Sequence, residues 1–334
     1  MILVYRSRAY DFDEALAAQS NVIQLSRIGV AKLLLKQRYD TVELNEPMLL
    51  SAWPSLLLYI FVIRLCDALR RSRTSIVSYA INNSDLAPAV SSYTHLPKFI
   101  SEFVARMFCT ILTGQYDRIA FGTPDARKTY ERAIGRMPRR MAVREFPALD
   151  SACRECVQSK NPNEVIFLGS FEPRKGITRL LDAWPLVLEK NPSSRLKIVG
   201  KGPLLEQLLL WQSISPTSTI DVDPSRAEIH THLSTAHVLV LYSQPSSRWK
   251  EQIGLPILEA LSHGCEIVAS SETGIAPWLL DHGHQVVPPH APKQQLASAI
   301  LKALVARRTA AEIKSELPDQ DNRLLASEWL WDRS

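Results

Sequence analysis

Short apolar runs alternate with longer helical stretches along most of this sequence, and this alternation limits the folds open to it. The runs VIFLG (165–169), LKIVG (196–200) and HVLVLYS (237–243) are nearly continuous in apolar residues. Such runs are typical of strands buried on both faces of a parallel sheet, because these strands have no solvent-facing side. The alternation therefore predicts an α/β fold with doubly wound parallel sheets.

The predicted strands form two series separated by a polar segment. The first series comprises Ile2–Tyr5, Val22–Leu25, Thr41–Leu44, Ser75–Tyr79, Arg118–Phe121 and Met141–Arg144. The second series comprises Val165–Leu168, Leu196–Val199, Thr219–Val222, Val238–Leu241, Glu266–Ala269 and Gln285–Val287. Helices are predicted within the first series at Val30–Gln37, Ser55–Arg70, Phe99–Leu112 and Ala126–Ile134.

The polar, turn-prone segment ALDSACRECVQSKNPNE is the best candidate for an interdomain linker. We therefore expect an N-terminal Rossmann-like domain at 1–150 and a second one at 151–316, each with its own core. Residues 317–334 contain two tryptophans and predict a terminal helix that docks back on the N-terminal domain. Ligands of open α/β sheets bind beyond the carboxyl ends of the strands, so we expect the chemistry in the cleft between the domains.

Positive charge is concentrated in the first half of the chain. Residues 1–150 hold 20 Lys and Arg against 14 Asp and Glu, whereas residues 151–334 hold 19 against 20. This asymmetry indicates an anionic partner, which is a membrane surface, a phosphate-bearing acceptor or nucleic acid. Nucleic acid is not expected, because the sequence has no basic stripe with interleaved aromatic residues.

The apolar segment MLLSAWPSLLLYIFVIRLCDAL (48–69) has two interpretations. Pro54 and Arg64 interrupt it, so its uninterrupted part is shorter than the ~20 residues that a bilayer crossing needs. It is either a buried helix packed on a parallel sheet or a helix that also dips into a membrane interface. The basic clusters at 70–73 and 139–140 are likewise either binding sites for anionic headgroups or solvated helix ends.

The five cysteines are scattered and odd in number, which favours a reducing compartment. Cys153 and Cys156 form a C-x-x-C pair, but a zinc site needs a second pair of ligands, and none lies nearby in the sequence. We therefore expect two thiols near the linker. The N-terminal stretch MILVYRSRAYDFDE lacks the layout of a signal peptide, so we expect a cytoplasmic protein, with the inner face of the membrane as its contact surface.

The most informative segment is EQIGLPILE, in which Glu251 and Glu259 are separated by seven residues. Gly254 permits a tight loop and Pro256 suits the first turn of a helix, so a helix is predicted at 257–263. The start of this helix offers free N–H groups to phosphate oxygens. By spacing alone, the two glutamates are equally a solvent-facing pair. However, Glu259 lies in the apolar run LPILEAL, where an unpaired carboxylate is costly.

The stretch EQIGLPILEALSHGCEIVASSETGIAPWLL resembles the donor-site signature Glu-x7-Glu of the retaining glycosyltransferases of family 4. IFLGSFEPRKGITRLLDAW and LKIVGKGPLLEQL resemble the first and second strand-loop-helix units of the same family's donor domain. The resemblance covers roughly 165–287, in the family's order, whereas the first half shows only the general alternation. It implies the GT-B fold, with two Rossmann-like domains facing a central cleft.

The resemblance also implies roles for individual residues. Lys175 would contact the donor diphosphate and neutralise charge on the leaving nucleotide. Glu259 would bind the nucleotide ribose, while Glu251 and the backbone of Gly254 and Leu255 would position the donor sugar. Residues near 223–225 would flank the base.

Two departures from the family pattern concern the donor phosphates and the sugar. Ser170 stands where the family usually has an arginine, and Arg174 either replaces it through its bidentate fork or is a solvated loop residue. The first loop of the chain lacks the glycines that the family often has there. His95 corresponds to a histidine that the family often places near the sugar, where it would orient a hydroxyl, although a lone loop histidine is commonly incidental.

The expected function is transfer of a sugar from a nucleoside-diphosphate donor to an acceptor hydroxyl with retention, in the assembly of a cell-surface glycan or glycolipid. The basic, partly apolar first half suits a glycan or lipid-linked acceptor at a membrane. No cofactor or metal is expected, and Asp221 and Asp223 are not expected to bind one. The alternative is a non-catalytic, sugar-nucleotide-binding subunit of a glycosyltransferase complex; an epimerase of the same fold is disfavoured by the motifs.

Overall fold

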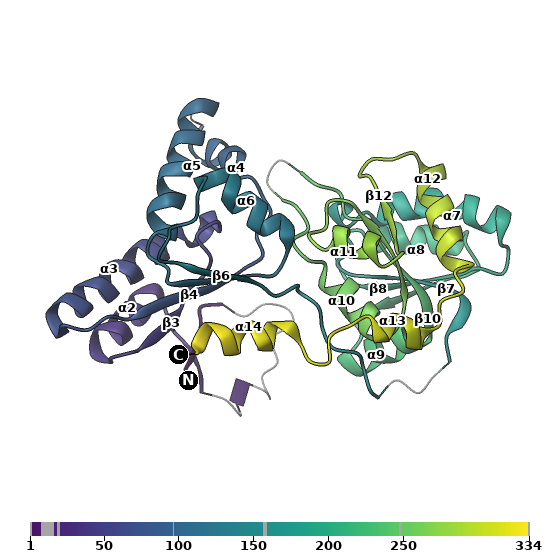
Figure 1. Ribbon diagram of the computed structural model, residues 1–334. Helices are drawn as coiled ribbons and strands as arrows, with labels where there is room; N and C mark the ends of the chain where they lie inside the picture. Colours follow the sequence, from purple (N-terminus) through teal and green to yellow (C-terminus); the bar gives the residue numbers. More distant parts are fainter. Residues whose placement is uncertain are drawn as a thin grey trace.

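Two parallel sheets, one in each half of the chain, organise the structure (Figure 1). The computed structural model describes residues 2–7, 17–18, 21–95, 97–155, 159–246 and 249–332. Every strand expected from the sequence is present, with bounds that differ by a few residues. The predicted α/β class is therefore confirmed, and the pairing of every described strand ladder is parallel.

The C-terminal sheet has six strands in the order β12-β11-β10-β7-β8-β9. Its strands are β7 (Asn161–Leu168), β8 (Arg195–Gly200), β9 (Ser218–Val222), β10 (Ala236–Leu241), β11 (Glu266–Ser270) and β12 (Gln285–Val287). Its helices are α7 (Ile177–Lys190), α8 (Leu205–Ser213), α9 (Arg226–Thr235), α10 (Leu255–Ser262), α11 (Ala276–Asp281), α12 (Lys293–Leu304) and α13 (Ala310–Ser315). From β7 the chain adds β8 and then β9 on one side. It then crosses to the other side of β7, where it adds β10, β11 and β12. The order thus reverses between β7 and β10, which makes this pair the topological switch point.

The core of this half lies on both faces of the central strands. Val165, Val238 and Ile267, on three adjacent strands, are completely buried, and Trp184 of α7 is nearly so. Burial of each such side chain contributes roughly 1.5–3 kcal/mol, which explains why these strands read as continuous apolar runs.

The N-terminal sheet has four strands in sequence order, β3-β4-β5-β6. Its strands are β3 (Thr41–Glu43), β4 (Ser75–Ala80), β5 (Arg118–Phe121) and β6 (Ala142–Glu145). Its helices are α2 (Arg27–Lys36), the 3-10 turn η1 (Leu50–Ala52), α3 (Trp53–Arg70), α4 (Leu86–Thr94), α5 (Lys98–Thr113) and α6 (Pro124–Ile134). Right-handed crossovers that always step in one direction place their helices on one face of the sheet.

Two features of this half differ from the sequence-based expectation. The first two predicted strands, β1 (Leu3–Tyr5) and β2 (Val22–Gln24), pair only with each other. Both are short and largely exposed, so they bury too little apolar surface to extend the main sheet. Helix α4 was not predicted, because Pro88 falls in its first turn, where proline is tolerated but reads as a helix breaker.

Helix α3 is long and apolar enough to span a membrane by length and composition, but half of it is buried inside the protein. Leu56, Ile60 and Ile63 lie in the core of the N-terminal half. The Arg64 guanidinium donates to the carbonyl oxygens of Thr74 and Gln115 at 2.9 and 2.8 Å. This packing favours the interpretation of α3 as a core helix on the parallel sheet.

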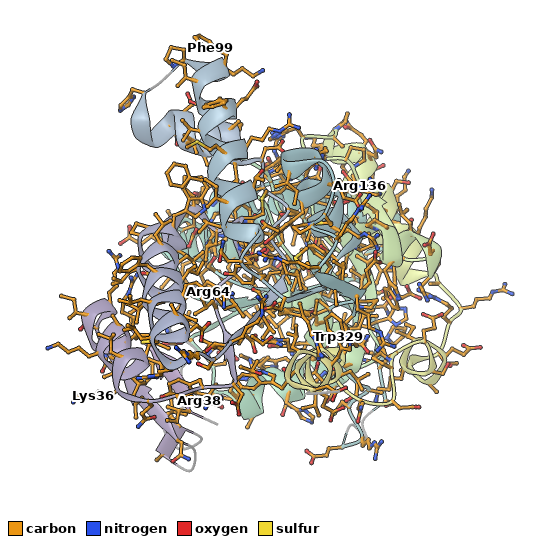
Figure 2. The ribbon with its side chains drawn as sticks, turned by 60° about the vertical axis from the view of Figure 1, so that its left-hand side comes forward. Lys36, Arg38, Arg64, Phe99, Arg136 and Trp329 are labelled. Carbon is orange, nitrogen blue, oxygen red and sulfur yellow. The ribbon has the colours of Figure 1, made fainter. Side chains whose placement is uncertain are left out.

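The opposite face of the N-terminal sheet is covered by the last helix, α14 (Asn322–Trp331), as Figure 1 shows. Along β4, Ile76 faces the core under α3 and α5, whereas Val77 packs with Ala326 and Leu330 of α14. On β5, Arg118 donates to the carbonyl oxygen of Trp329 at 2.7 Å. Trp329 on α14 and Phe99 at the outer tip of α5 are both labelled in Figure 2.

The carboxyl ends of the two sheets face each other. Asn83, which follows β4, donates from Nδ2 to the carbonyl oxygen of Glu251 at 3.0 Å. Two segments connect the halves, one after β6 and one before α14 (Figure 1). These segments are joined by a hydrogen bond from the Asn322 N–H to the Leu149 carbonyl at 3.2 Å.

Candidate active site at the switch point

The loop after β7 lies directly on the end of β10. A 3-10 turn at Pro173–Lys175 ends at Gly176, whose φ of 76° is one that other residues resist. A Cβ at Gly176 would lie 1.8 Å from the carbonyl oxygen of Tyr242, so only glycine allows this approach. The Gln244 N–H then donates to the Arg174 carbonyl at 2.8 Å. The two loops that flank the switch point are thereby locked together.

Lys175 and Glu251 meet between these loops. Lys175 Nζ lies 2.6 Å from Glu251 Oε2, and Ser243 Oγ donates to the same oxygen at 2.8 Å. The side chains of the ion pair are only 13% and 10% exposed, so the two charges depend on each other for solvation. Among the described residues, no hydrogen bond reaches Oε1 of Glu251, which leaves one carboxylate oxygen available to a ligand.

Neighbouring segments clamp the chain around Glu251. Asn83 holds the Glu251 carbonyl from the N-terminal half. Thr273 Oγ1 donates to the Ile253 carbonyl at 2.7 Å, and the Gly274 N–H donates to the Gln252 carbonyl at 3.0 Å. These bonds fix the backbone at Glu251 and at the two residues after it, so the position of the carboxylate does not depend on the ion pair alone.

Trp249 forms an aromatic surface beneath the two basic residues. The Arg174 Cζ lies 4.5 Å and the Lys175 Nζ 5.2 Å from its ring centroid, both within the range of cation–π attraction. Arg174 also pairs with Glu172, and this guanidinium holds the pKa of Glu172 below its usual value. Ser170 is half-buried in the same loop. Arg174 is thus an anchored residue rather than a freely solvated one.

Helix α10 starts beside this cluster, at Gly254 with a φ of 83°. Leu255 is the first helical residue and is exposed, and Pro256 follows it, so the first-turn N–H groups are available to an anion. Glu259, one turn on, is partly buried and pairs through Oε1 with Arg226 Nη2 of α9 at 3.0 Å. The acidic residue in the apolar run therefore has a cationic partner.

His95 is not brought to this cluster. It ends α4 with a φ of 56° and is exposed. Asn83 lies near the start of that helix and His95 at its far end, about 13 Å further along the helix axis. No contact among the described residues joins His95 to Lys175 or Glu251, and its role in orienting a sugar hydroxyl remains a prediction.

Asp221 and Asp223 have separate partners. Asp221 Oδ2 lies 2.6 Å from His232 Nε2, and Asp223 Oδ1 lies 2.7 Å from Lys201 Nζ. The segment that contains Asp223 leads into α9, which starts at a capping box formed by Ser225 and Glu228. Since α9 also carries Arg226, the segment expected to flank a base leads directly to the partner of Glu259.

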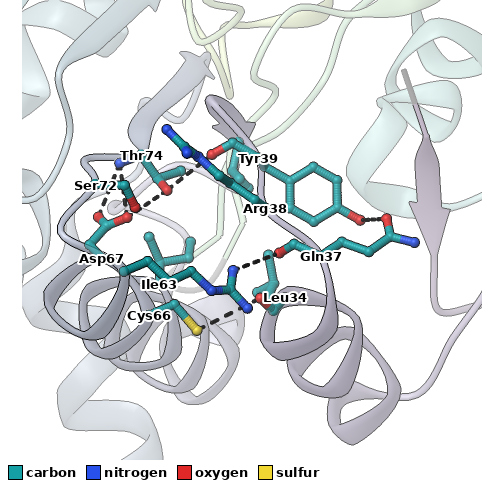
Figure 3. A pocket seen from close by; sticks show the side chains of 11 residues that line it. Leu34, Gln37, Arg38, Tyr39, Ile63, Cys66, Asp67, Ser72 and Thr74 are labelled. Atoms are coloured by element: carbon teal, nitrogen blue, oxygen red, sulfur yellow. Dashed lines mark hydrogen bonds between the residues drawn. The ribbon is translucent and has the colours of Figure 1, made fainter.

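A small cavity of about 10 Å³ lies elsewhere, between α2, α3 and the start of β4 (Figure 3). Arg70 crosses it and donates to the Leu35 carbonyl at 2.5 Å and the Gln37 carbonyl at 3.2 Å, which satisfies the end of α2. Asp67 accepts from the N–H and hydroxyl of Thr74. This cavity lies at the amino end of β4 and holds no more than a water molecule.

Sequence reasoning missed four residues at the site, namely Asn83, Arg226, Ser243 and Trp249. Ser243 and Trp249 lie in the loop between β10 and the Glu-x7-Glu segment, so their position along the chain was a usable signal. Asn83 and Arg226 are 168 and 33 residues from their partners, and no local pattern indicates either contact.

Part of the chain is similar in sequence to known glycosyltransferases. Residues 162–305 match the family model described as glycosyl transferases group 1. Over 164 residues the chain is 32% identical to phosphatidyl-myo-inositol mannosyltransferase of Mycobacterium tuberculosis, a match that covers 47% of this chain and 40% of that protein. It is 26% identical over 160 residues to the uncharacterized glycosyltransferase YqgM of Bacillus subtilis, covering 47% and 43%. The chain thus spans less than half the length of these curated relatives.

Solved structures match over almost the whole chain. Alr3699/HepE of Anabaena, crystallised with UDP and glucose, has a TM-score of 0.62 at 14% identity and covers 94% of this chain and 84% of its own. WaaG, a glycosyltransferase involved in lipopolysaccharide biosynthesis, has a TM-score of 0.59 at 14% identity and covers 93% and 86%. At such identities the likeness concerns the fold. The chain therefore has the two-domain GT-B fold, and its residues 162–305 match the glycosyl transferases group 1.

Proposed function

We propose that this chain is a retaining glycosyltransferase that moves a sugar from a nucleoside-diphosphate donor to an acceptor hydroxyl. The observation that carries the proposal is the buried Lys175–Glu251 pair, which lies at the switch point beside the start of α10. A cation, a carboxyl group and free helix N–H groups converge there. These are the groups that a diphosphate and an adjacent sugar need.

In the proposed donor complex, each group has one task. The Lys175 ammonium turns from Glu251 toward the diphosphate, joined by the N–H groups of Gly254 and Leu255. Oε1 of Glu251 accepts a hydrogen bond from a sugar hydroxyl. The ribose diol takes the place of Arg226 on Glu259; this exchange costs little, because Arg226 is 74% exposed and a pair with so exposed a partner is weak.

The proposed reaction breaks the bond between the anomeric carbon and the diphosphate oxygen, and the electron pair leaves with the nucleotide. A phosphate oxygen of the departing group takes the proton of the acceptor hydroxyl, which attacks from the same face and retains the configuration. Lys175 offsets the charge that develops on the diphosphate. In this proposal no side chain acts as a nucleophile and no metal takes part in the chemistry.

A binding panel tests the donor site. UDP, GDP, ADP and dTDP are titrated calorimetrically into the intact chain, Glu259→Ala and Lys175→Met. We expect one nucleotide to bind, with a clear loss of affinity in both variants. Glu189→Ala and Lys190→Met, at exposed positions on α7, are matched controls that retain binding. Absence of binding by all four nucleotides would contradict the proposal.

Turnover separates an enzyme from a non-catalytic binding subunit. With the matching nucleotide sugar, the purified chain is expected to release the nucleotide, either by transfer or by slow hydrolysis. NMR of the anomeric proton in the product then tests retention. Nucleotide binding without any turnover, with and without acceptors, would favour the subunit. Loss of activity in EDTA that manganese alone restores would contradict a metal-free reaction.

On the acceptor side, we propose a glycan or lipid-linked acceptor at the cytoplasmic face of an anionic membrane. Helices α3 and α5 each expose an apolar residue every fourth position, on the side away from the sheet. These residues are Leu57, Phe61, Leu65 and Leu69 on α3, and Phe99, Phe103, Met107 and Ile111 on α5. Lys98 and Arg106 flank the second row, which is the composition of an interfacial helix.

Vesicle flotation tests this contact. The chain is expected to float with phosphatidylglycerol vesicles at low salt and to be released at high salt. Phe61→Ser combined with Phe103→Ser should reduce flotation. Leu210→Ser, which alters an equally exposed side chain on α8 of the other half, should not. Equal flotation with neutral and anionic vesicles would contradict the proposed contact with an anionic membrane. Absence of flotation with either kind of vesicle would contradict it as well.

A further inference from the structure

Three metal-binding side chains from distant parts of the sequence meet where the linker passes the donor half. They are Cys153 of the linker, His230 of α9 and His263 at the end of α10. One potential ligand atom from each lies within 4.8 Å of the other two. Cys153, for which the sequence indicates no further ligands beyond the C-x-x-C pair, thus has two histidines beside it.

The histidine rings are already oriented for such a role. His263 Nε2 lies 3.0 Å from His230 Nδ1, while His263 Nδ1 lies 2.6 Å from the Glu259 carbonyl oxygen. A ring nitrogen that donates to a backbone carbonyl leaves the opposite nitrogen unprotonated, as in most histidines that bind metals. His263 is buried and His230 is half-buried, and the two rings pack edge to face, so only small rotations are open to them.

The backbone at Cys153 is also held in place. The Cys153 N–H donates to the Ser262 carbonyl at 2.8 Å, and Lys314 Nζ donates to the Cys153 carbonyl at 3.2 Å. The thiol therefore stays beside His263 without any contribution from the sulfur itself. The position of Cys153 is therefore set by hydrogen bonds to its backbone.

We propose that Cys153, His230 and His263 bind a zinc-type transition-metal ion that fastens the linker to α9 and α10. One thiolate and two imidazoles are the ligands that zinc prefers, and tetrahedral zinc sets such atoms about 3.3–3.6 Å apart. The present spacing reaches this geometry by small side-chain rotations. Cys156 lies outside the described residues and is not counted among the ligands.

This ion would serve structure rather than the transfer reaction. It lies at the end of α10, whereas the proposed phosphate contacts lie at the start of that helix. Its two histidine ligands lie on or at the end of the helices that carry Arg226 and Glu259. The ion would therefore set the distance between α9 and α10, and with it the stability of the donor half.

Metal content is the direct test. The intact chain is loaded with zinc, desalted and analysed by elemental mass spectrometry. We expect about one zinc per chain, and much less in Cys153→Ser and in His230→Gln. Cys66→Ser and His282→Gln, a thiol and an imidazole outside the cluster, are matched controls that keep the metal. Equal zinc in the wild type and both cluster variants would overturn the proposal and leave a hydrogen-bonded histidine pair.

Cobalt(II) provides a second measurement that needs no variant to fold. Substitution by cobalt in the wild type should produce a thiolate-to-cobalt charge-transfer band and the intense visible bands of tetrahedral coordination. Only the weak spectrum of hydrated cobalt would contradict the site. Both readouts are independent of nucleotide binding. If chelation lowers turnover, zinc rather than manganese should restore it, which separates this ion from a catalytic metal.

Discussion

The carboxyl ends of both sheets carry a buried glutamate, but the two are satisfied in different ways. Glu251, at the C-terminal sheet, pairs with the Lys175 ammonium at 2.6 Å. Glu46, at the N-terminal sheet, accepts from the N–H groups of Ile81 and Asn82 at 3.1 and 3.0 Å, and no cation among the described residues pairs with it. Burial raises the pKa of Glu46 to about 7. One glutamate is thus paired with a cation, whereas the other is held by backbone N–H groups.

This difference follows from the topology of the two sheets. At a switch point, the loops of two central strands diverge and leave room for side chains from both, which is where Lys175 and Glu251 meet. The N-terminal sheet follows sequence order in its described strands and has no such reversal. Its glutamate instead organises the segment that carries Asn83. The edge of the C-terminal sheet carries an ion pair, whereas Glu46 at the edge of the N-terminal sheet holds a backbone segment in place.

The largest effect is expected from breaking the ion pair. Lys175→Met leaves Glu251 buried without a cation and should lower the free energy of unfolding by about 3–5 kcal/mol. Turnover should fall by about 10²–10³. Adding Glu251→Gln should recover stability but not turnover, as measured by urea unfolding and by nucleotide release. Recovery of both would mean that Lys175 serves only to neutralise Glu251.

The next effect concerns the two faces of the N-terminal sheet. Leu330→Ala removes a buried side chain of α14 and should cost about 2–5 kcal/mol, whereas Leu324→Ala, at an exposed position on the same helix, should cost little. Hydrogen exchange should rise in β4 and β5 and remain unchanged in β7 and β10. A uniform rise across both sheets would show that the halves unfold as one unit.

Glu46 should make the stability of the folded protein depend on pH. Because its folded pKa is about 7 and its unfolded value is 4.5, the folded state holds a proton that the unfolded state releases between these values. Stability is therefore highest below pH 4.5 for this group and falls as pH rises to 7, by at most about 3 kcal/mol. Glu46→Gln should flatten this part of the profile in thermal unfolding measured across pH. An unchanged slope in the variant would mean that groups other than Glu46 cause the pH dependence of stability in this range.

A comparison of two matched glycines tests how tightly the loop after β7 is held against β10. Gly176 and Gly283 both have a φ of 76°, but a Cβ at Gly283 meets only the Arg308 guanidinium at 3.7 Å or more. Gly283→Ala should cost about 1–2 kcal/mol from backbone strain alone. Gly176→Ala should cost roughly 1–3 kcal/mol more, because it collides with the Tyr242 carbonyl. Equal losses would mean that the loop after β7 adapts freely.

Much of the local structure was predictable. The strand positions were correct within a few residues, and the helix predicted at 257–263 is present but starts two residues earlier, at Leu255. Apolar periodicity and special backbone residues act over a few neighbouring positions, which is why these elements could be predicted. Helix α4 was missed because of Pro88. The separation of β1 and β2 from the main sheet depends on how much surface each buries, which a strand pattern alone does not reveal.

The sequence by itself determined the α/β class, the position of the Glu-x7-Glu loop and the need of Glu259 for a partner, since these depend on short-range chemistry. The tertiary structure alone decided that Lys175 meets Glu251, that Asn83 holds the same loop, that α14 closes the N-terminal sheet and that two histidines lie beside Cys153. Such contacts join residues that are tens to hundreds of positions apart. They depend on strand order and crossover direction, which the periodicity of a single chain does not encode.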